Sequence, residues 1–188
     1  MIGTPTEKPG QRTVRKATPQ SLENAALHYL ERFAASADSL RRVLMRRVER
    51  SARVHDTDRE DGAAAVAAII ERFQRAGLLN DTVYAEGRVA ALHRRGVSAR
   101  GIRQQLAAKG VDRATVEEAL AGLAADTPDP DFAAAVAYAR RRRLGPWRSI
   151  GRAERRERDL AALARQGFPY AIAIQVIDAP DPEALEPD

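Results

Sequence analysis

The recurrence of short amphipathic helices with similar boundary residues is the feature that most restricts the fold of this chain. Apolar residues recur at steps of three and four, the spacing of one helix face. The first such run contains Leu22, Ala25, Ala26, Tyr29, Leu30 and Phe33. Helix-capping residues precede the successive runs at Thr18, Ser36, Asp81, Ser98 and Asp112, and glycines follow at Gly77, Gly96 and Gly110. Such caps begin and end α-helices, so the pattern predicts an all-α protein with no sheet.

The helices also repeat along the chain. Moving the sequence by 62 residues aligns Ser36 with Ser98, together with the apolar positions that follow each of them. Moving it by 57 residues aligns Gly110 with Gly167. The matching Ser and Gly residues favour a true repeat over chance alignment of apolar residues. We therefore expect three tandem three-helix repeats, each too small to bury a core alone, stacked into an elongated, curved body.

The expected boundaries follow the changes in composition. They are a disordered basic arm at 1–18, repeat 1 at 19–81 with a polar insertion at 49–61, repeat 2 at 82–126, repeat 3 at 127–179 with an arginine-rich insertion, and an acidic tail at 180–188. The second insertion follows the Gly145-Pro146 turn and falls within 147–159. In repeat 3, helices are expected over 133–143, over 160–165 and from about Pro169.

Positive charge is concentrated in one part of the chain. The net charge is +5, but residues 140–158 hold nine arginines and only two acidic residues, a surplus of seven positive charges. Guanidinium groups bind phosphate and carboxylate through paired hydrogen bonds, so this segment is the best candidate for an anionic partner. The candidate partner-binding residues are Arg140, Arg141, Arg142, Arg143, Arg148 and Arg152, with Arg94 and Arg95 as an extension of the same surface.

Two alternatives concern the same segment. The arginines could instead form ion pairs with Glu154, Glu157 and Asp159, although the charge surplus leaves most of them without an acidic neighbour in sequence. Trp147 could be a contact residue for a partner. For Trp147 we favour packing beneath the turn that follows Gly145-Pro146.

Several sequence motifs resemble the RecX regulatory proteins of bacteria. They are Ala26-Leu27-His28-Tyr29-Leu30, Gly77-Leu78-Leu79-Asn80-Asp81, Tyr84-Ala85 and Lys109-Gly110-Val111. The segment from Arg140 to Pro146 resembles the third repeat of alphaproteobacterial members. The resemblance covers about 21–178. Relatives tend to have a Lys/Arg-Gly step where this chain has Arg47-Val48, so we expect the second helix to end differently here.

The resemblance implies a function that composition and periodicity do not supply. It implies a regulator that binds the filament of RecA on single-stranded DNA and inhibits its ATP hydrolysis, strand exchange and co-protease activity. Such a protein is not an enzyme and needs no cofactor. The alternative is a direct DNA-binding protein with helix-turn-helix-like units. Against that alternative, the arginines gather in one repeat rather than recurring on a recognition helix in each.

Other classes of site find no support in the sequence. The chain has no cysteine and only three histidines, His28, His55 and His93, which lack metal-ligand spacing. It has no glycine-rich phosphate loop, and its serines are explained as helix caps. No apolar run approaches the roughly 18 residues that span a bilayer, and residues 1–18 lack the apolar stretch of a secretory signal. We expect a cytoplasmic monomer with no metal, no cofactor and no membrane contact.

Overall fold

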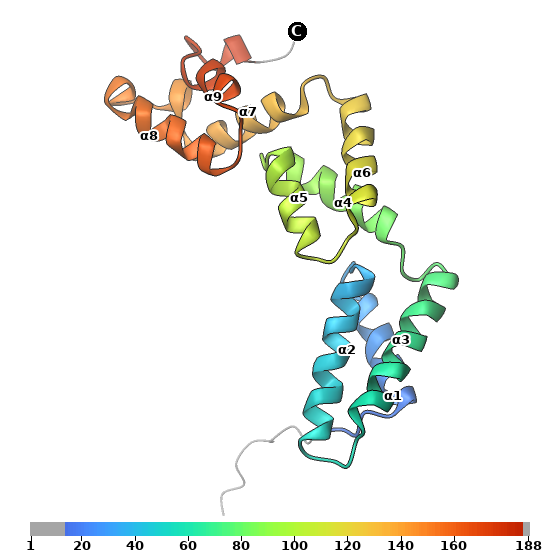
Figure 1. Ribbon diagram of the computed structural model, residues 1–188. Coiled ribbons are helices and arrows are strands. Elements are labelled where there is room, and N and C mark those ends of the chain that lie inside the picture. The colour runs from blue at the N-terminus through green and yellow to red at the C-terminus, as the bar shows by residue number, and fades with distance from the viewer. Residues whose placement is uncertain (1–13, 186–188) are drawn as a thin grey trace, which may run out of the picture. The chain divides into compact units, whose positions relative to one another are not determined.

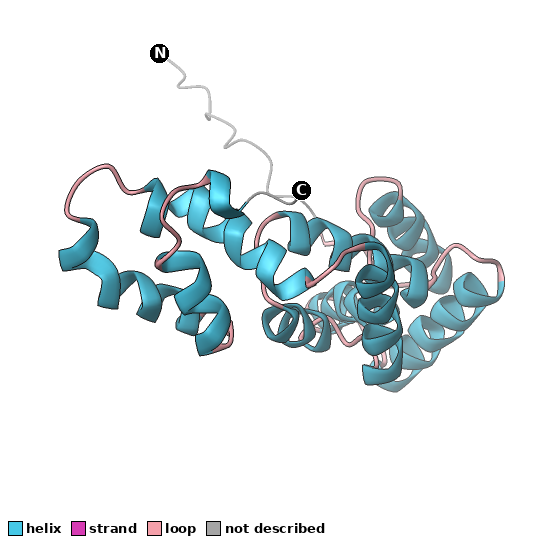
Figure 2. Ribbon diagram, turned by 90° about the horizontal axis from the view of Figure 1, so that it is seen from above, coloured by secondary structure: helices cyan, strands magenta, loops and turns pink. Residues whose placement is uncertain are grey.

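The computed structural model describes residues 14–185, and this part of the chain is helical. It contains nine α-helices and two short 3₁₀ helices, with no strand between residues 14 and 185 (Figures 1 and 2). The all-α prediction is therefore confirmed. Residues 1–13 of the predicted arm and 186–188 of the predicted tail lie outside the described residues. The chain divides into two compact units, Met1–Leu79 and Asn80–Asp188. The stacked, elongated arrangement of all three repeats stays a prediction.

The first unit is a three-helix bundle. It contains α1 (Pro19–Leu30), α2 (Ala37–Ala52) and α3 (Arg59–Arg75). Thr18 and Ser36 cap α1 and α2 as predicted, because each side-chain oxygen accepts a backbone N–H three residues later. The helices surround a core whose most buried side chains include Leu22, Leu40, Leu44, Val48 and Val66.

About half of the predicted polar insertion at 49–61 is helical. Helix α2 continues past Val48 to Ala52, and α3 already begins at Arg59, so the connection is only 53–58. The sequence did not indicate this extension of α2, because the residue buried there, Ser51, is polar. The Ser51 hydroxyl is fully buried, lies 2.7 Å from the Thr57 hydroxyl and accepts the Ala17 N–H at 2.9 Å.

The end of the predicted disordered arm lies against the first unit. Besides the Ala17 contact, a His55 ring nitrogen lies 2.7 Å from the Val14 carbonyl oxygen. Residues 14–18 are thus tied to the connection between α2 and α3. The sequence did not indicate this, because the contacts use the backbone groups of Val14 and Ala17, and any residue type offers the same backbone groups.

The second unit contains two groups of three helices. The first group is α4 (Asp81–Arg94), α5 (Ala99–Ala107) and α6 (Arg113–Asp126), around a core of residues such as Val89, Ile102 and Leu106. Ser98 and Asp112 cap α5 and α6 as predicted. Helix α4 is capped by Asn80 rather than by Asp81, since the Asn80 side-chain oxygen accepts the N–H groups of Thr82 and Val83.

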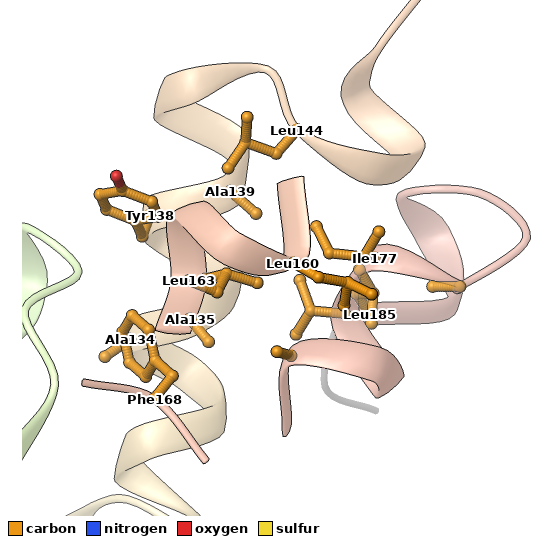
Figure 3. Close-up of a cluster of buried hydrophobic side chains, with 13 residues drawn as sticks. Ala134, Ala135, Tyr138, Ala139, Leu144, Leu160, Leu163, Phe168, Ile177 and Leu185 are labelled. Atoms are coloured by element: carbon orange, nitrogen blue, oxygen red, sulfur yellow. The ribbon is translucent and has the colours of Figure 1, made fainter. Parts of the chain in front are cut away.

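The second group follows a short connection at 127–129. It is α7 (Pro130–Arg142), α8 (Arg152–Arg165) and α9 (Tyr170–Ile177), with short 3₁₀ helices η1 (Gly145–Trp147) and η2 (Glu183–Leu185). Figure 3 shows its core, to which α7 contributes Ala134, Ala135 and Ala139 and α8 contributes Leu160 and Leu163. Helix α8 begins eight residues before the predicted start at Leu160. The arginine-rich insertion is therefore mostly helix, and one face of it is buried at Asp159, Leu160 and Leu163.

The predicted acidic tail is also partly folded. Leu185 is 6 % exposed and belongs to the same core as Leu160 and Ile177 (Figure 3). It is preceded by a turn in which Asp181 accepts the Ala184 N–H. Leu185 therefore holds residues 180–185 against the core, and this part of the acidic segment is not an unstructured tail.

The two groups of the second unit are joined by partly buried polar contacts. The Ser98 hydroxyl, which caps α5, also donates to the Gln166 carbonyl at 2.6 Å. The Asp131 carboxylate accepts the Ala99 N–H at 2.7 Å, and a ring nitrogen of His93 lies 2.8 Å from the Pro130 carbonyl. A Cβ added at Gly96 would lie 2.5 Å from the Tyr138 nitrogen, so the end of α4 meets α7 closely. These contacts fix the end of α4 relative to α7.

Candidate site for an anionic partner

The arginine run surrounds the C-terminal end of α7. Arg140, Arg141 and Arg142 form the last turn, and Arg143 follows it in the left-handed conformation, with φ 55° and ψ 50°. All four side chains are exposed. Arginines at this end of a helix are favoured by the negative end of the helix dipole.

Helix α7 ends in a Schellman motif, the bonding pattern in which a left-handed residue closes the last turn. The Leu144 N–H donates to the Ala139 carbonyl at 2.9 Å, and the Arg143 N–H donates to the Arg140 carbonyl at 3.2 Å. Leu144 is buried in the core beside Ala139. The helix expected over 133–143 therefore ends one residue earlier than predicted, at Arg142, and Arg143 lies beyond its last helical residue.

Three other helices end in the same pattern, each around a glycine. Gly96, Gly110 and Gly167 have φ values of 70°, 72° and 88° and occupy the position that Arg143 occupies after α7. Left-handed backbone is free of side-chain strain only in glycine. An arginine at this position is therefore a departure from the chain's own pattern, at a cost of about 1–2 kcal/mol.

Replacing Arg143 with glycine should raise the stability of the second unit by about 1 kcal/mol, because the left-handed strain disappears. Replacing it with alanine removes the same guanidinium but keeps a Cβ, so no such gain is expected. Thermal melts of both variants beside the parent protein provide the measurement. Equal melting temperatures for the two variants would show that the left-handed backbone at Arg143 is not strained.

Arg141 links the run to the predicted extension on α4. Its guanidinium donates to the Arg95 carbonyl oxygen and lies 5.6 Å from the centre of the Tyr138 ring. Arg94 and Arg95 are themselves exposed at the end of α4. The structure therefore brings the two predicted groups of arginines together at adjacent helix ends.

Arg148 and Arg152 make contacts inside the second unit instead. Arg148 forms a two-point ion pair with Asp159, which is 3 % exposed, with N–O distances of 2.7 and 3.1 Å. This hydrogen bonding raises the pKa of the Arg148 guanidinium. Arg152 donates to the carbonyl oxygens of Ile177, Ala179 and Pro180. Both side chains hold the segment around η1 and the end of α9 in place.

Two further features of the segment concern neighbouring residues. Trp147 packs against the core, as favoured from the sequence. Arg156 pairs with Asp178 at 2.7 Å and with Glu157, an arrangement that raises the pKa of Arg156 and lowers that of Asp178. Of the ion pairs with acidic neighbours considered above, those with Asp159 and Glu157 are present.

Arg165 was missed by the sequence reasoning. It lies in the last turn of α8, outside the 140–158 segment, yet it shares a pocket with Arg141, Arg142 and Arg143. A basic residue in the last turn of a helix is common, so its sequence position carried no functional signal.

Metal and membrane sites find no support in the described part of the chain. Between residues 14 and 185, no group of three or more His, Cys, Asp or Glu side chains could hold a metal ion. None of the helices described there combines the length and apolar character that crossing a bilayer requires.

Comparison with known proteins identifies the family. The family model for the second three-helix domain of RecX matches residues 80–120, which includes α4 and α5. The regulatory protein RecX of Myxococcus xanthus is 45 % identical over 90 % of this chain and 91 % of its own. That of Agrobacterium fabrum is 33 % identical over 86 % of this chain and 84 % of its own.

Solved structures agree on the fold. A crystal structure of regulatory protein RecX covers 85 % of this chain and 71 % of its own, with a TM-score of 0.63 and 21 % identity. The RecX structure from Lactobacillus salivarius covers 85 % and 94 %, with a TM-score of 0.60 and 23 % identity. The alphaproteobacterial type is not established, because the M. xanthus relative is more similar than the A. fabrum one. The chain therefore belongs to the RecX family of regulatory proteins, a non-enzymatic family of RecA inhibitors.

Proposed function

We propose that this chain binds the RecA filament on single-stranded DNA and thereby inhibits its ATP hydrolysis, strand exchange and co-protease activity. The observation that carries the proposal is the similarity to RecX along nine-tenths of the chain, at 45 % identity to the M. xanthus protein. It acts as a cytoplasmic monomer without a cofactor. The likeness of the arginine run to alphaproteobacterial members is retained as part of the proposal.

The proposed contact surface is formed by exposed arginines at two helix ends. It contains Arg140, Arg141, Arg142 and Arg143 at the end of α7, with Arg94 and Arg95 at the end of α4. No ion pair to a carboxylate is formed by these six side chains within residues 14–185. Guanidinium groups whose charge no internal carboxylate neutralises attract an anionic nucleoprotein and bind its phosphates or carboxylates. The proposed surface does not include Arg148 and Arg152, which the sequence had suggested, because Arg148 is paired with Asp159 and Arg152 donates to three carbonyl oxygens.

The test is the ATP hydrolysis of RecA on single-stranded DNA. We expect the steady-state rate to fall progressively as this protein is added, because a bound inhibitor holds the filament in a state that hydrolyses ATP slowly. An unchanged rate with the protein in excess over RecA would overturn the proposal. Binding to bare DNA, to RecA alone and to the assembled filament, at one salt concentration, then separates filament recognition from the direct DNA-binding alternative. That alternative predicts equal affinity for bare DNA and filament.

A further inference from the structure

A pocket lined mainly by polar atoms lies where the end of α7 meets the end of α8. Four of its lining residues are arginines: Arg141 and Arg142 of α7, Arg143 directly after it, and Arg165 of α8. The others are Tyr138, Leu144, Ala162 and Gln166. In Figure 3, Tyr138 and Leu144 mark the α7 side of this region. No acidic residue lines the pocket, so its four positive charges have no counter-charge there.

The arginines of the pocket are not explained by internal structure. Arg142, Arg143 and Arg165 form no ion pair within residues 14–185, and all three are exposed. Arg141 is the one that is held, by the Arg95 carbonyl and the face of Tyr138. Like charges gathered without a carboxylate repel one another, so this arrangement is unfavourable unless an anion enters.

Backbone strain points to the same pocket. Arg143 is the residue that takes the left-handed position where three other helices of this chain have glycine. Residues in strained backbone conformations cluster at active sites and ligand-binding sites. The strained turn places Arg143 beside Arg141, Arg142 and Arg165 in the lining, whereas glycine would close the helix equally well and add no charge.

We propose that this pocket binds the phosphodiester backbone of single-stranded DNA. Each arginine can contact the non-bridging oxygens of a phosphate, and a strand offers one negative charge at every nucleotide. The lining has little apolar surface, and Tyr138 is only 6 % exposed and covered by Arg141, so no ring is free to stack on a base. Binding is therefore to the backbone and independent of sequence. The inference rests on the proposed function and identifies the DNA strand of the filament as the ligand of this part of the surface.

The experiment measures the affinity for labelled oligo(dT) across a salt series. The test variant combines Arg142→Gln with Arg165→Gln, one from each helix of the pocket. Its matched control combines Arg155→Gln with Arg158→Gln, two exposed arginines of α8 that form no ion pair within the described chain and do not line the pocket. Both variants lose two charges, so an effect of net charge alone appears equally in each.

We expect the test variant to bind oligo(dT) about tenfold more weakly at low salt. The dependence of log affinity on log salt should become shallower by about 1.4, because each lost phosphate contact on a single strand removes about 0.7. The control should keep the parent slope, and a mixed-sequence oligonucleotide should bind like oligo(dT). Equal slopes in test and control variants would overturn the inference, as would displacement of oligo(dT) by poly-glutamate at equal charge.

Two parallel measurements keep the outcome interpretable. Circular dichroism melts check that both variants fold, and the single variant Arg165→Gln replaces the pair if the double variant does not. The RecA hydrolysis assay is run with the parent protein. If the parent protein does not inhibit hydrolysis, the proposed function is overturned. If it does inhibit, but the test variant keeps the parent's salt dependence of DNA binding, only the pocket is overturned.

Discussion

Replacing Asp159 with alanine should lower the free energy of unfolding of the second unit by about 3 kcal/mol. The Asp159 carboxylate is 3 % exposed and accepts hydrogen bonds from the Gly145 N–H at 3.0 Å and from two nitrogens of Arg148. Alanine would leave that N–H unsatisfied and the Arg148 charge, itself only 24 % exposed, without its partner. Removing one partner of a buried ion pair is more damaging than the pair is stabilising.

A thermal melt followed by circular dichroism measures the change. For a unit of this size, about 3 kcal/mol corresponds to a fall of roughly 10 °C in the transition of the second unit. Glu157→Ala is the control on the same helix: Glu157 is 82 % exposed in its pair with Arg156, and such pairs contribute about 0–1 kcal/mol. If both variants melt together, Asp159 does not hold the end of α7 and η1 against α8.

Reversing two charges at the end of α7 should have the largest effect on function. Arg140→Glu combined with Arg142→Glu replaces two exposed positive charges of the proposed contact surface by negative ones. We expect the affinity for the RecA filament to fall at least tenfold, about 1.4 kcal/mol, since attraction to an anionic partner becomes repulsion. The fold should persist, at a cost of about 0.3–1 kcal/mol for each anion near the helix C-terminus.

The control for net charge lies in the first unit. Arg46→Glu combined with Arg50→Glu makes the same change on α2, where both side chains are exposed and form no ion pair with a described residue. Filament affinity measured for both variants across a salt series, beside their melting curves, separates a local contact from a general effect of charge. Equal losses of affinity would show that the end of α7 is not a preferred contact. An unchanged affinity in a folded α7 variant would place the contact surface elsewhere.

Most of the helical architecture was accessible from the sequence. The caps at Ser36 and Ser98 and the glycine ends at Gly96 and Gly110 depend on hydrogen bonds between residues three to five positions apart. The apolar spacing likewise reports one face of one helix. Such short-range interactions are encoded locally, so helix type and most helix starts were predicted correctly. The family resemblance depended on the same local motifs.

The lengths of α2 and α8 could not be predicted from such local patterns. Both helices continue through polar sequence because a few polar residues are buried on one face, Ser51 in α2 and Asp159 in α8. A polar residue reads as exposed in a sequence. It is buried here because a partner distant along the chain satisfies it, as Ala17 does for Ser51 at a separation of 34 residues.

The candidate site, too, was only partly predictable from the sequence. The distribution of charge along the sequence located the arginine surplus, and the run from Arg140 to Arg143 is exposed. Which arginines remain available was decided by tertiary contacts: Arg148 meets Asp159 across 11 residues, Arg152 meets carbonyls 25 or more residues away, and Arg165 comes beside Arg143 from another helix. A guanidinium has the same local sequence pattern whether it faces a partner or an internal carboxylate. Only the packing of α7, α8 and α9 determines which anion it can reach.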